Sequence, residues 1–249
     1  MTATPQPPES VARHTTPRDS PGGHGSAAVV FLDMSGYTAL TEVHGDERAA
    51  DIAERLATFS AAALADGDRI VKTLGDAVLL TSRTARTALA LIARILDTWT
   101  TRGDGVPVLR GGVHYGPVVE RNNDVFGATV NLAARVAAAA ATDQILLTAP
   151  VATAARAEGL RVIDLGPRAF RNVSDPVPVY ALGIDCLCGT IDPVCRMRVD
   201  PLGAPSLTHG ERRFWFCSTS CTEQFTAEPD RYLASVDCVD TRPTHASTL

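Results

Sequence analysis

The sequence predicts an α+β domain, in which helices pack on a largely antiparallel sheet, followed by a small cysteine-rich module. Short β-rich runs and segments with helical periodicity alternate from Ala27 to about Gly183, an order typical of α+β domains. All six cysteines lie from Cys186 onward, and this uneven division indicates two domains. Residues 1–26 contain almost no large apolar side chains and are predicted to be a disordered tail.

The first predicted elements are a strand, a helix and a hairpin. Residues 27–34 form a short apolar run that suits a buried strand, and apolar residues at helical spacing predict a helix over 46–65. The β-rich runs 69–74 and 77–82 are joined by Gly75 and Asp76, a junction typical of hairpins. Asp76 is therefore expected at the hairpin tip.

The later elements follow from the same patterns. They are a helix over 84–99, a strand over 106–120, a helix over 127–141, strands over 145–149, 161–166 and 177–183, and a short helix through Phe225 and Tyr232.

Composition limits the classes of function. The chain has 249 residues, of which 45% are hydrophobic and 20% charged, enough for one sizeable core and a small appendage. A net charge of -5 gives no broad basic field for nucleic acid or an acidic membrane. No apolar run is long enough for a membrane span, and the N-terminus lacks the apolar core of a signal peptide. We expect a soluble, cytoplasmic protein.

Two aspartates are candidate metal ligands. Asp33 ends the first buried strand, and Asp76 lies on the neighbouring hairpin tip. Carboxylates on adjacent strand ends can hold one or two Mg²⁺ or Mn²⁺ ions, which take oxygen ligands and share them with substrate phosphates. Either aspartate by itself is more often a turn or helix-cap residue.

A second group of polar residues surrounds the helix over 127–141. Asp124 precedes a Phe-Gly turn, and Asn131 and Arg135 lie four residues apart on one helix face. Without further context, these two would be solvated surface residues. Lys72 is the only lysine among 23 basic residues, which indicates a position that requires a compact ammonium group, although chance survival is the alternative.

These motifs together resemble a known family. The segments FLDMSGYT, KTLGD, VHYGPV and NDVFGATVNLAAR, in this order, resemble the catalytic domain of class III adenylate and guanylate cyclases. The resemblance covers roughly residues 27–183 and implies a ferredoxin-like fold.

The resemblance implies a role for each candidate residue. The matching residues are Asp33 and Asp76 for the metal ions, Lys72 and Asp124 for the purine, Asn131 for the ribose, and Arg135 for the transition state. Adenine offers N1 as an acceptor and its amino group as a donor, so a lysine beside an aspartate predicts ATP over GTP.

The implied activity is that of an adenylate cyclase, which converts ATP into 3′,5′-cyclic AMP and pyrophosphate with two Mg²⁺ or Mn²⁺ ions per site. In the family each site draws its metal aspartates from one chain and the other residues from its partner. This chain holds a complete set, so the resemblance implies a homodimer with two equivalent sites.

The segments GTIDPVCRMRVD, FWFCSTSC and PDRYL resemble a YHS domain, a short module found beside metal-handling proteins. The match covers roughly residues 189–235, and we expect the module over residues 186–235. Cys195, Cys217 and Cys221 match its motif and are candidate ligands for Zn²⁺ or Cu⁺. A fourth ligand could be Cys186, Cys188 or His209. The alternative is that the three motif cysteines are small hydrophobic residues of an aromatic core.

The remaining residues of interest have no assigned role. His44 and His114 are interpreted as ordinary loop and strand residues, Cys238 has no evident function, and residues 236–249 are expected to be a flexible tail.

Two other functions compete with the enzyme. One is a non-catalytic nucleotide-binding regulator that keeps the fold without turnover. The other is a metal sensor in which the cyclase-like domain is only a dimerisation scaffold. The first predicts ATP binding without product, and the second predicts affinity for a soft metal without cyclase activity.

Overall fold

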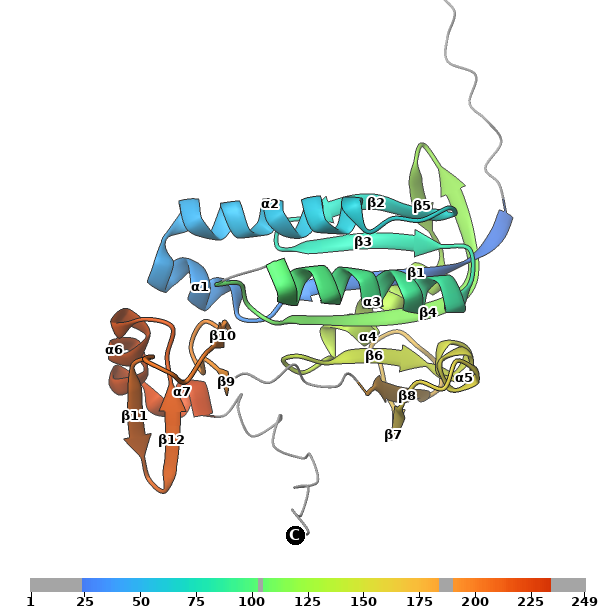
Figure 1. Ribbon diagram of the computed structural model, residues 1–249. Coiled ribbons are helices and arrows are strands. Elements are labelled where there is room, and N and C mark those ends of the chain that lie inside the picture. The colour runs from blue at the N-terminus through green and yellow to red at the C-terminus, as the bar shows by residue number, and fades with distance from the viewer. Residues whose placement is uncertain (1–23, 103–104, 184–189, 234–249) are drawn as a thin grey trace, which may run out of the picture.

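A computed structural model describes residues 24–102, 105–183 and 190–233 (Figure 1). Its largest part is an eight-stranded sheet with the order β2-β3-β1-β4-β6-β8-β7, in which β5 also pairs with β4. β4 and β6 are parallel, whereas the other neighbours are antiparallel. The predicted α+β class with a mainly antiparallel sheet is confirmed.

The strands of this sheet are β1 His24–Met34, β2 Asp68–Leu74, β3 Ala77–Ser82, β4 Leu109–Arg121, β5 Asp124–Phe126, β6 Ile145–Thr148, β7 Val162–Arg168 and β8 Val177–Leu182. The helices around it are α1 Tyr37–His44, α2 Asp46–Ala62, α3 Ala85–Arg102, α4 Ala128–Ala138 and α5 Ala149–Ala157.

Strand β1 is buried on both faces, which explains its continuous apolar sequence. Even-numbered residues such as Val30 and Leu32 pack in a core with residues of α1, α2, α3 and α5. Val29, on the opposite face, packs with Ala133 of α4. Helices therefore cover both faces of the sheet, and Figure 1 shows α2 and α3 in front of it.

Two short helices, α1 and α5, were not among the predicted elements. α1 has eight residues, and its N-cap Gly36 has a φ of 74° and provides no side-chain cap. α5 has nine residues, begins directly after β6 and is rich in alanine. Such short helices give little periodic signal and are stabilised by tertiary packing.

Glycines of β4 allow α4 to lie close to the sheet. A Cβ atom at Gly112 would lie only 2.2 Å from the backbone nitrogen of Ala137, and one at Gly116 would lie 2.7 Å from Oγ1 of Thr129. The close approach fixes the position of the helix that carries Asn131 and Arg135.

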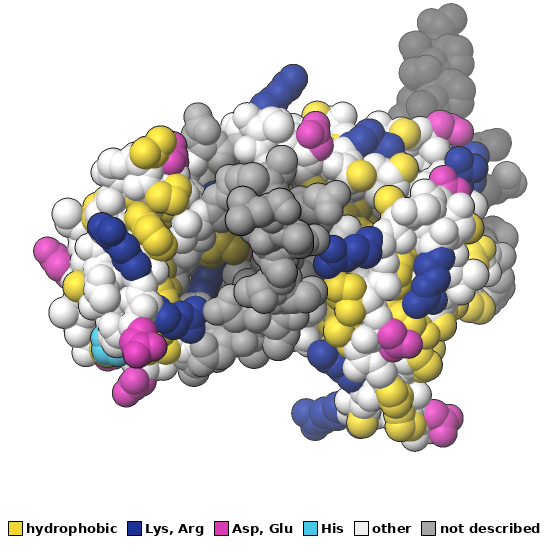
Figure 2. Space-filling model, turned by 60° about the horizontal axis from the view of Figure 1, so that its bottom comes forward, with side chains coloured by type: hydrophobic (Ala, Val, Ile, Leu, Met, Phe, Trp, Pro, Cys, Tyr) yellow, Lys and Arg dark blue, Asp and Glu magenta, His cyan; other side chains and the backbone are white. Residues whose placement is uncertain are grey.

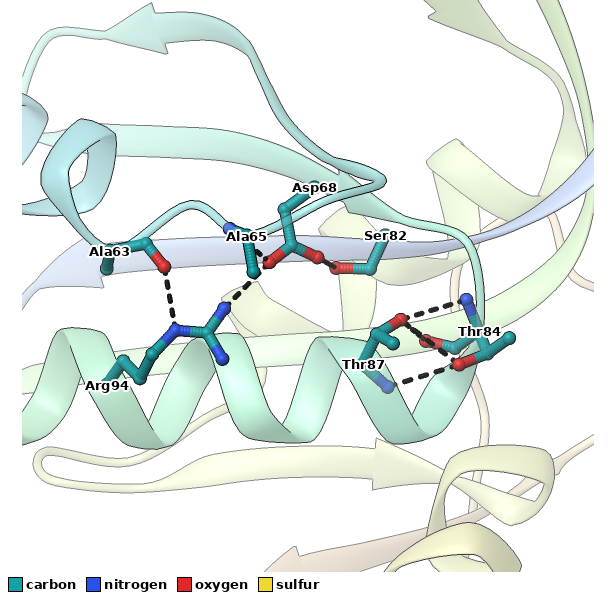
Figure 3. Close-up of polar contacts among 7 residues, drawn as sticks. All are labelled: Ala63, Ala65, Asp68, Ser82, Thr84, Thr87 and Arg94. Atoms are coloured by element: carbon teal, nitrogen blue, oxygen red, sulfur yellow. Dashed lines mark hydrogen bonds and ion pairs between the residues drawn. The ribbon is translucent and has the colours of Figure 1, made fainter.

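A buried carboxylate joins the start of β2 to its neighbours (Figure 3). Oδ1 of Asp68 accepts a hydrogen bond of 2.6 Å from Ser82, and Oδ2 lies 2.7 Å from Nη2 of Arg94 on α3. Arg94 also donates to the carbonyl of Ala63, directly after α2. The network ties α2, α3, β2 and β3 together at one point.

The cysteine-rich segment, residues 190–233, contains the hairpin-like pairs β9 Thr190–Ile191 with β10 Arg198–Val199, and β11 Ser206–His209 with β12 Arg212–Trp215, followed by α6 Thr219–Ala227 and α7 Pro229–Leu233. The single helix predicted there is in fact two helices, because Glu228 and Pro229 interrupt it.

This segment packs beside α1 (Figure 1) and shares its core. Phe216 and Phe225 are fully buried and belong to the same apolar cluster as Leu40 of α1. Arg231 forms an ion pair of 3.2 Å with Glu42 of α1. The two parts therefore form a continuous packing unit.

Figure 2 shows one face of the molecule, on which basic and acidic side chains are interspersed and form no broad basic patch. Within residues 24–102, 105–183 and 190–233, no helix combines the length and apolar character of a membrane span.

Candidate active site and a cysteine-histidine cluster

The predicted metal aspartates are neighbours at one end of the central strands. Asp33 lies opposite Ala77 in the β1–β3 register, and the Met34 N–H donates to the carbonyl of Asp76 at 3.2 Å. Partial burial and the nearby Asp33 carboxylate both raise the pKa of Asp76. Two carboxylates held this close disfavour each other's charge, and a bound cation would relieve that repulsion.

Arg110 of β4 is a further member of this group. It lies opposite Asp33 in the register, and its Nε and Nη2 atoms lie 2.9 and 2.6 Å from Oδ2 of Asp33. Both contacts are to the same oxygen, so the ion pair does not use Oδ1. Sequence analysis missed Arg110. The available signal was a single charged residue inside the apolar run VPVLRGGV.

Lys72 and Asp124 meet although they are 52 residues apart. Nζ of Lys72 lies 2.6 Å from Oδ2 of Asp124, with side chains 43% and 27% exposed. Oδ1 of Asp124 accepts a hydrogen bond of 2.8 Å from the Val125 N–H. The Lys72 ammonium, followed by that N–H, lowers the pKa of Asp124. The pair is therefore a charged donor beside a charged acceptor, within reach of solvent.

Asn131 and Arg135 lie on α4, with Asn131 exposed and Arg135 half-buried. Among the described residues, no side-chain hydrogen bond or ion pair joins either of them to Asp33, Asp76, Lys72 or Asp124. A single chain thus brings together Asp33 with Asp76 and Lys72 with Asp124. The two predicted residues of α4 make no described side-chain hydrogen bond or ion pair with either pair.

The three motif cysteines converge, and His44 joins them. Sγ of Cys217 lies 3.4 Å from Sγ of Cys195 and 3.6 Å from Sγ of Cys221. Nε2 of His44 lies 3.5 Å from Cys217 Sγ and 3.7 Å from Cys221 Sγ. Hydrogen bonds from the thiols of Cys195 and Cys221 lower the pKa of Cys217. The interpretation of His44 as an ordinary loop residue is wrong.

The fourth ligands that the sequence suggested lie elsewhere. His209 is exposed at the end of β11, and its ring packs edge-on against Phe225 with centroids 5.9 Å apart. Cys186, Cys188 and Cys238 lie outside the described residues. His114 is a strand residue, as predicted: its Nδ1 lies 2.8 Å from Oγ1 of Thr148, and burial lowers its pKa.

Comparison with protein families gives one match over most of the chain. Residues 21–182 match the adenylate and guanylate cyclase catalytic domain. The chain belongs to this family. The matched residues include the whole eight-stranded sheet, whereas the separate strand pairs β9–β10 and β11–β12 lie outside the match.

Several curated relatives of this chain are named adenylate cyclases. An adenylate cyclase of Streptomyces coelicolor is 42% identical over 121 residues, which are 48% of this chain and 32% of that protein. A second, from Streptomyces griseus, is 32% identical over 175 residues, or 63% of this chain and 44% of that protein. The chain thus spans less than half the length of these relatives.

A short segment of the chain is similar to a protein of another kind. A copper-transporting P-type ATPase of Rhizobium leguminosarum is 51% identical over only 45 residues, 18% of this chain and 5% of that protein.

Solved structures show the same cyclase fold. The adenylyl cyclase CyaB of P. aeruginosa superposes with a TM-score of 0.55 at 21% identity, covering 67% of this chain and 97% of that one. An adenylate/guanylate cyclase/hydrolase of Silicibacter pomeroyi has a TM-score of 0.55 at 28% identity, covering 66% of this chain and 99% of that one.

The carboxylate pair formed by Asp33 and Asp76 fits the Mg²⁺ or Mn²⁺ ions that class III cyclases use. Both ions prefer oxygen ligands and are held by one or two carboxylates together with substrate phosphates. Asp33 and Asp76 would supply that donor set, and burial followed by the neighbouring Asp33 carboxylate raises the pKa of Asp76.

Proposed function

We propose that this cyclase is an adenylate cyclase, which converts ATP into 3′,5′-cyclic AMP and pyrophosphate. The observation that carries the proposal is the contact of 2.6 Å between Lys72 and Asp124, because it places a cationic donor next to an acceptor. The adenylate cyclases among the curated relatives support the same substrate.

The Lys72–Asp124 pair reads adenine through complementary hydrogen bonds. The ammonium group donates to adenine N1, and the carboxylate accepts from the N6 amino group. Guanine presents an N–H at N1 and a carbonyl at C6, so both contacts are mispaired. A site built for hydrogen bonding discriminates strongly against such a mispaired ligand. ATP is therefore the preferred substrate.

Asp33 and Asp76 hold two Mg²⁺ or Mn²⁺ ions in this proposal. Bound there, the ions would favour loss of the ribose 3′-hydroxyl proton to solvent and would offset the negative charge of the triphosphate. O3′ then attacks the α-phosphorus, the bond from phosphorus to the bridging oxygen breaks, and pyrophosphate leaves. The pairing of Arg110 with Oδ2 of Asp33 orients that carboxylate.

Asn131 and Arg135 act on the ribose and on the transition state. Asn131 holds the ribose in position for attack, and Arg135 meets the charge that builds on the α-phosphoryl oxygens. Because no described hydrogen bond or ion pair joins Asn131 or Arg135 to the Asp33 and Asp76 carboxylates within one chain, we infer that a homodimer completes the site. Each site takes Asp33 and Asp76 from one protomer and the purine, ribose and transition-state residues from its partner.

We further infer a cyclase domain over residues 27–183 and a YHS-like module over residues 186–235. Two short strand pairs and two helices around Phe225 support a compact second module. The three cysteines in the described part of the chain are free, and these thiols, together with a nucleoside triphosphate substrate, favour the reducing cytoplasm.

The decisive experiment measures product from purified protein with ATP or GTP and with Mn²⁺ or Mg²⁺. We expect cyclic AMP from ATP, little product from GTP, and loss of product in Lys72→Ala and Asp76→Ala. Asp66→Ala is the matched control, because this carboxylate is 90% exposed and pairs only with Arg83 among the described residues. A folded dimer that binds ATP tightly but forms no product with either metal would instead indicate a nucleotide-binding regulator.

A further inference from the structure

The cysteine-histidine cluster has the dimensions of a tetrahedral metal site. A zinc ion with Zn–S of about 2.3 Å and Zn–N of about 2.0–2.1 Å places sulfur atoms about 3.8 Å from one another and about 3.6 Å from nitrogen. The measured values are 3.4 and 3.6 Å between sulfur atoms, and 3.5 and 3.7 Å from His44 Nε2 to sulfur. All four ligand atoms lie within 4.8 Å of one another.

A disulfide does not explain this cluster. A disulfide joins sulfur atoms about 2.0 Å apart, whereas the shortest separation here is 3.4 Å, and all three cysteines are free. Simple burial in an aromatic core does not explain it either, because such packing does not require an imidazole nitrogen to meet two sulfur atoms.

We propose that His44 of helix α1 is the fourth ligand of a Cys₃His zinc site with Cys195, Cys217 and Cys221. The ion is then shared between the part of the chain that carries the cyclase fold and the cysteine-rich segment. Three cysteines and a histidine in a closed tetrahedral arrangement are typical of structural zinc.

A buried aspartate supports the two cysteine loops. Oδ1 of Asp192 accepts hydrogen bonds of 2.7 Å from the Val194 N–H and 3.3 Å from the Cys195 N–H. Its Oδ2 accepts one of 2.8 Å from the Cys217 N–H. Asp192 is fully buried, so a carboxylate is committed to holding these loops together. Groups that hydrogen-bond to the ligand residues in this way hold those residues in position in metal sites.

The third cysteine is fixed by a helix cap. The hydroxyl of Ser218 accepts a hydrogen bond of 3.2 Å from the Cys221 N–H at the start of α6. Cys217 and Cys221 are thereby held on one side of the cluster, and His44 approaches both of their sulfur atoms from α1.

The site braces both ends of α1. His44 is the last residue of this helix. At its first end, a Cβ atom at Gly36 would lie 2.7 Å from Arg196 Cγ and 3.5 Å from the backbone of Cys195. The Ser35 N–H donates to Val108, whose own N–H donates to Arg196, each at 2.9 Å. Asp33 lies two residues before Ser35, so Arg196, the residue next to the ligand Cys195, contacts the segment that follows a proposed metal-binding aspartate.

Cobalt substitution of the full-length protein tests the ligand set. Co²⁺ bound by three thiolates and an imidazole gives tetrahedral d–d bands and sulfur-to-cobalt charge transfer. We expect one such ion in the wild type and in His209→Gln, the matched histidine control from the same region. His44→Gln should bind at least about tenfold more weakly and lose the tetrahedral bands.

A rescue variant separates ligand loss from misfolding. His44→Cys restores a fourth ligand, and we expect it to regain tetrahedral bands with stronger charge transfer. Affinity and spectra of His44→Gln equal to those of His209→Gln would overturn the proposal. Failure of His44→Cys to recover tetrahedral binding in a folded protein would also contradict it.

Hydrogen exchange tests whether the ion braces α1. We expect added Zn²⁺ to slow amide exchange over residues 33–44 in the wild type and in His209→Gln, but not in His44→Gln. Equal slowing in all three proteins would show that the ion does not act through His44.

Cu⁺ is the competing ion. If the protein binds Cu⁺ more tightly than Zn²⁺, and His44→Gln does not change that affinity, the cluster would instead be a three-cysteine copper site. None of these measurements depends on cyclase activity.

Discussion

A β-bulge decides where the Lys72 ammonium group points. Ile70 lies opposite Leu80 and Lys72 lies opposite Leu79, so Val71 is an extra residue in β2. With regular pairing, Lys72 would lie opposite Val78, whose side chain belongs to the core under α2 and α3. The bulge instead places Lys72 on the face of Leu79, the face that α4 covers. One extra residue thus turns a charged side chain out of the core and toward Asp124.

This placement makes Lys72→Arg a severe change in spite of the conserved charge. A guanidinium group is planar and longer than an ammonium group, so it cannot meet both Asp124 and adenine N1 with the same geometry. We expect kcat/KM for ATP to fall by at least about tenfold, equivalent to about 1.4 kcal/mol. Steady-state kinetics measure it. Arg69→Lys on the same strand is the control, since Arg69 donates to the carbonyl of Asn123 in the β4–β5 turn and pairs with Glu120 of β4. Equal losses in both variants would contradict a specific role for Lys72.

At the residue scale, the contacts that could be predicted from the sequence were those between residues of the family motifs. Lys72 and Asp124 were predicted as a pair and are one. Asp33 and Asp76 were predicted on adjacent strand ends, where they lie. His44 could not be placed, because Cys217 is 173 residues away in the chain. The weak signal was its spacing of four from Leu40, a buried residue on the same helix face.

At the element scale, the long periodic segments were predictable and the short ones were not. The β2–β3 hairpin and helices α2, α3 and α4 were expected from their patterns and are present. α1 and α5 escaped because tertiary packing stabilises them. α1 packs against α2 and the cysteine-rich segment, and α5 packs against α3, β8 and β4. The pairing of Asp33 with Arg110 escaped for a related reason, since strand register is set by the assembled sheet.

The Asp68 network is expected to stabilise the four elements that it joins. The Asp68 side chain is 1% exposed, pairs with Arg94, and accepts hydrogen bonds from the Ser82 hydroxyl and the Ala65 N–H. Asp68→Ala leaves these donors without their acceptor, so we expect the free energy of unfolding to fall by about 2–3 kcal/mol. Denaturant unfolding measures the change.

A matched control lies two residues earlier. Asp66 pairs with Arg83 at 3.1 Å, but the two side chains are 90% and 68% exposed. Exposed ion pairs contribute little, so Asp66→Ala should change the free energy of unfolding by less than about 0.5 kcal/mol. Similar effects of the two substitutions would mean that burial of Asp68 is not what makes its network stabilising.

At the scale of the whole molecule, the shared-site dimer predicts complementation. Asp33→Ala and Arg135→Ala proteins should each be inactive. Mixed dimers contain one site with both residues intact, so random exchange of protomers should restore about a quarter of wild-type activity. The assay measures cyclic AMP from ATP after mixing, with mixing shown by a tag on one variant. Heterodimers that form without activity would rule out a site divided in this way.

The distance along the chain between His44 and Cys217 has a consequence for biosynthesis. A ribosome that adds about 5–20 residues per second needs roughly 10–35 s to move from one codon to the other across 173 residues. During that interval β1 to β8 emerge and can assemble, while α1 lacks the aromatic cluster that covers Leu40. The last turn of α1 is therefore covered by the aromatic cluster only late in synthesis. Because translation runs from the N-terminus, the sheet forms first, the cysteine-rich segment packs second, and the ion binds last.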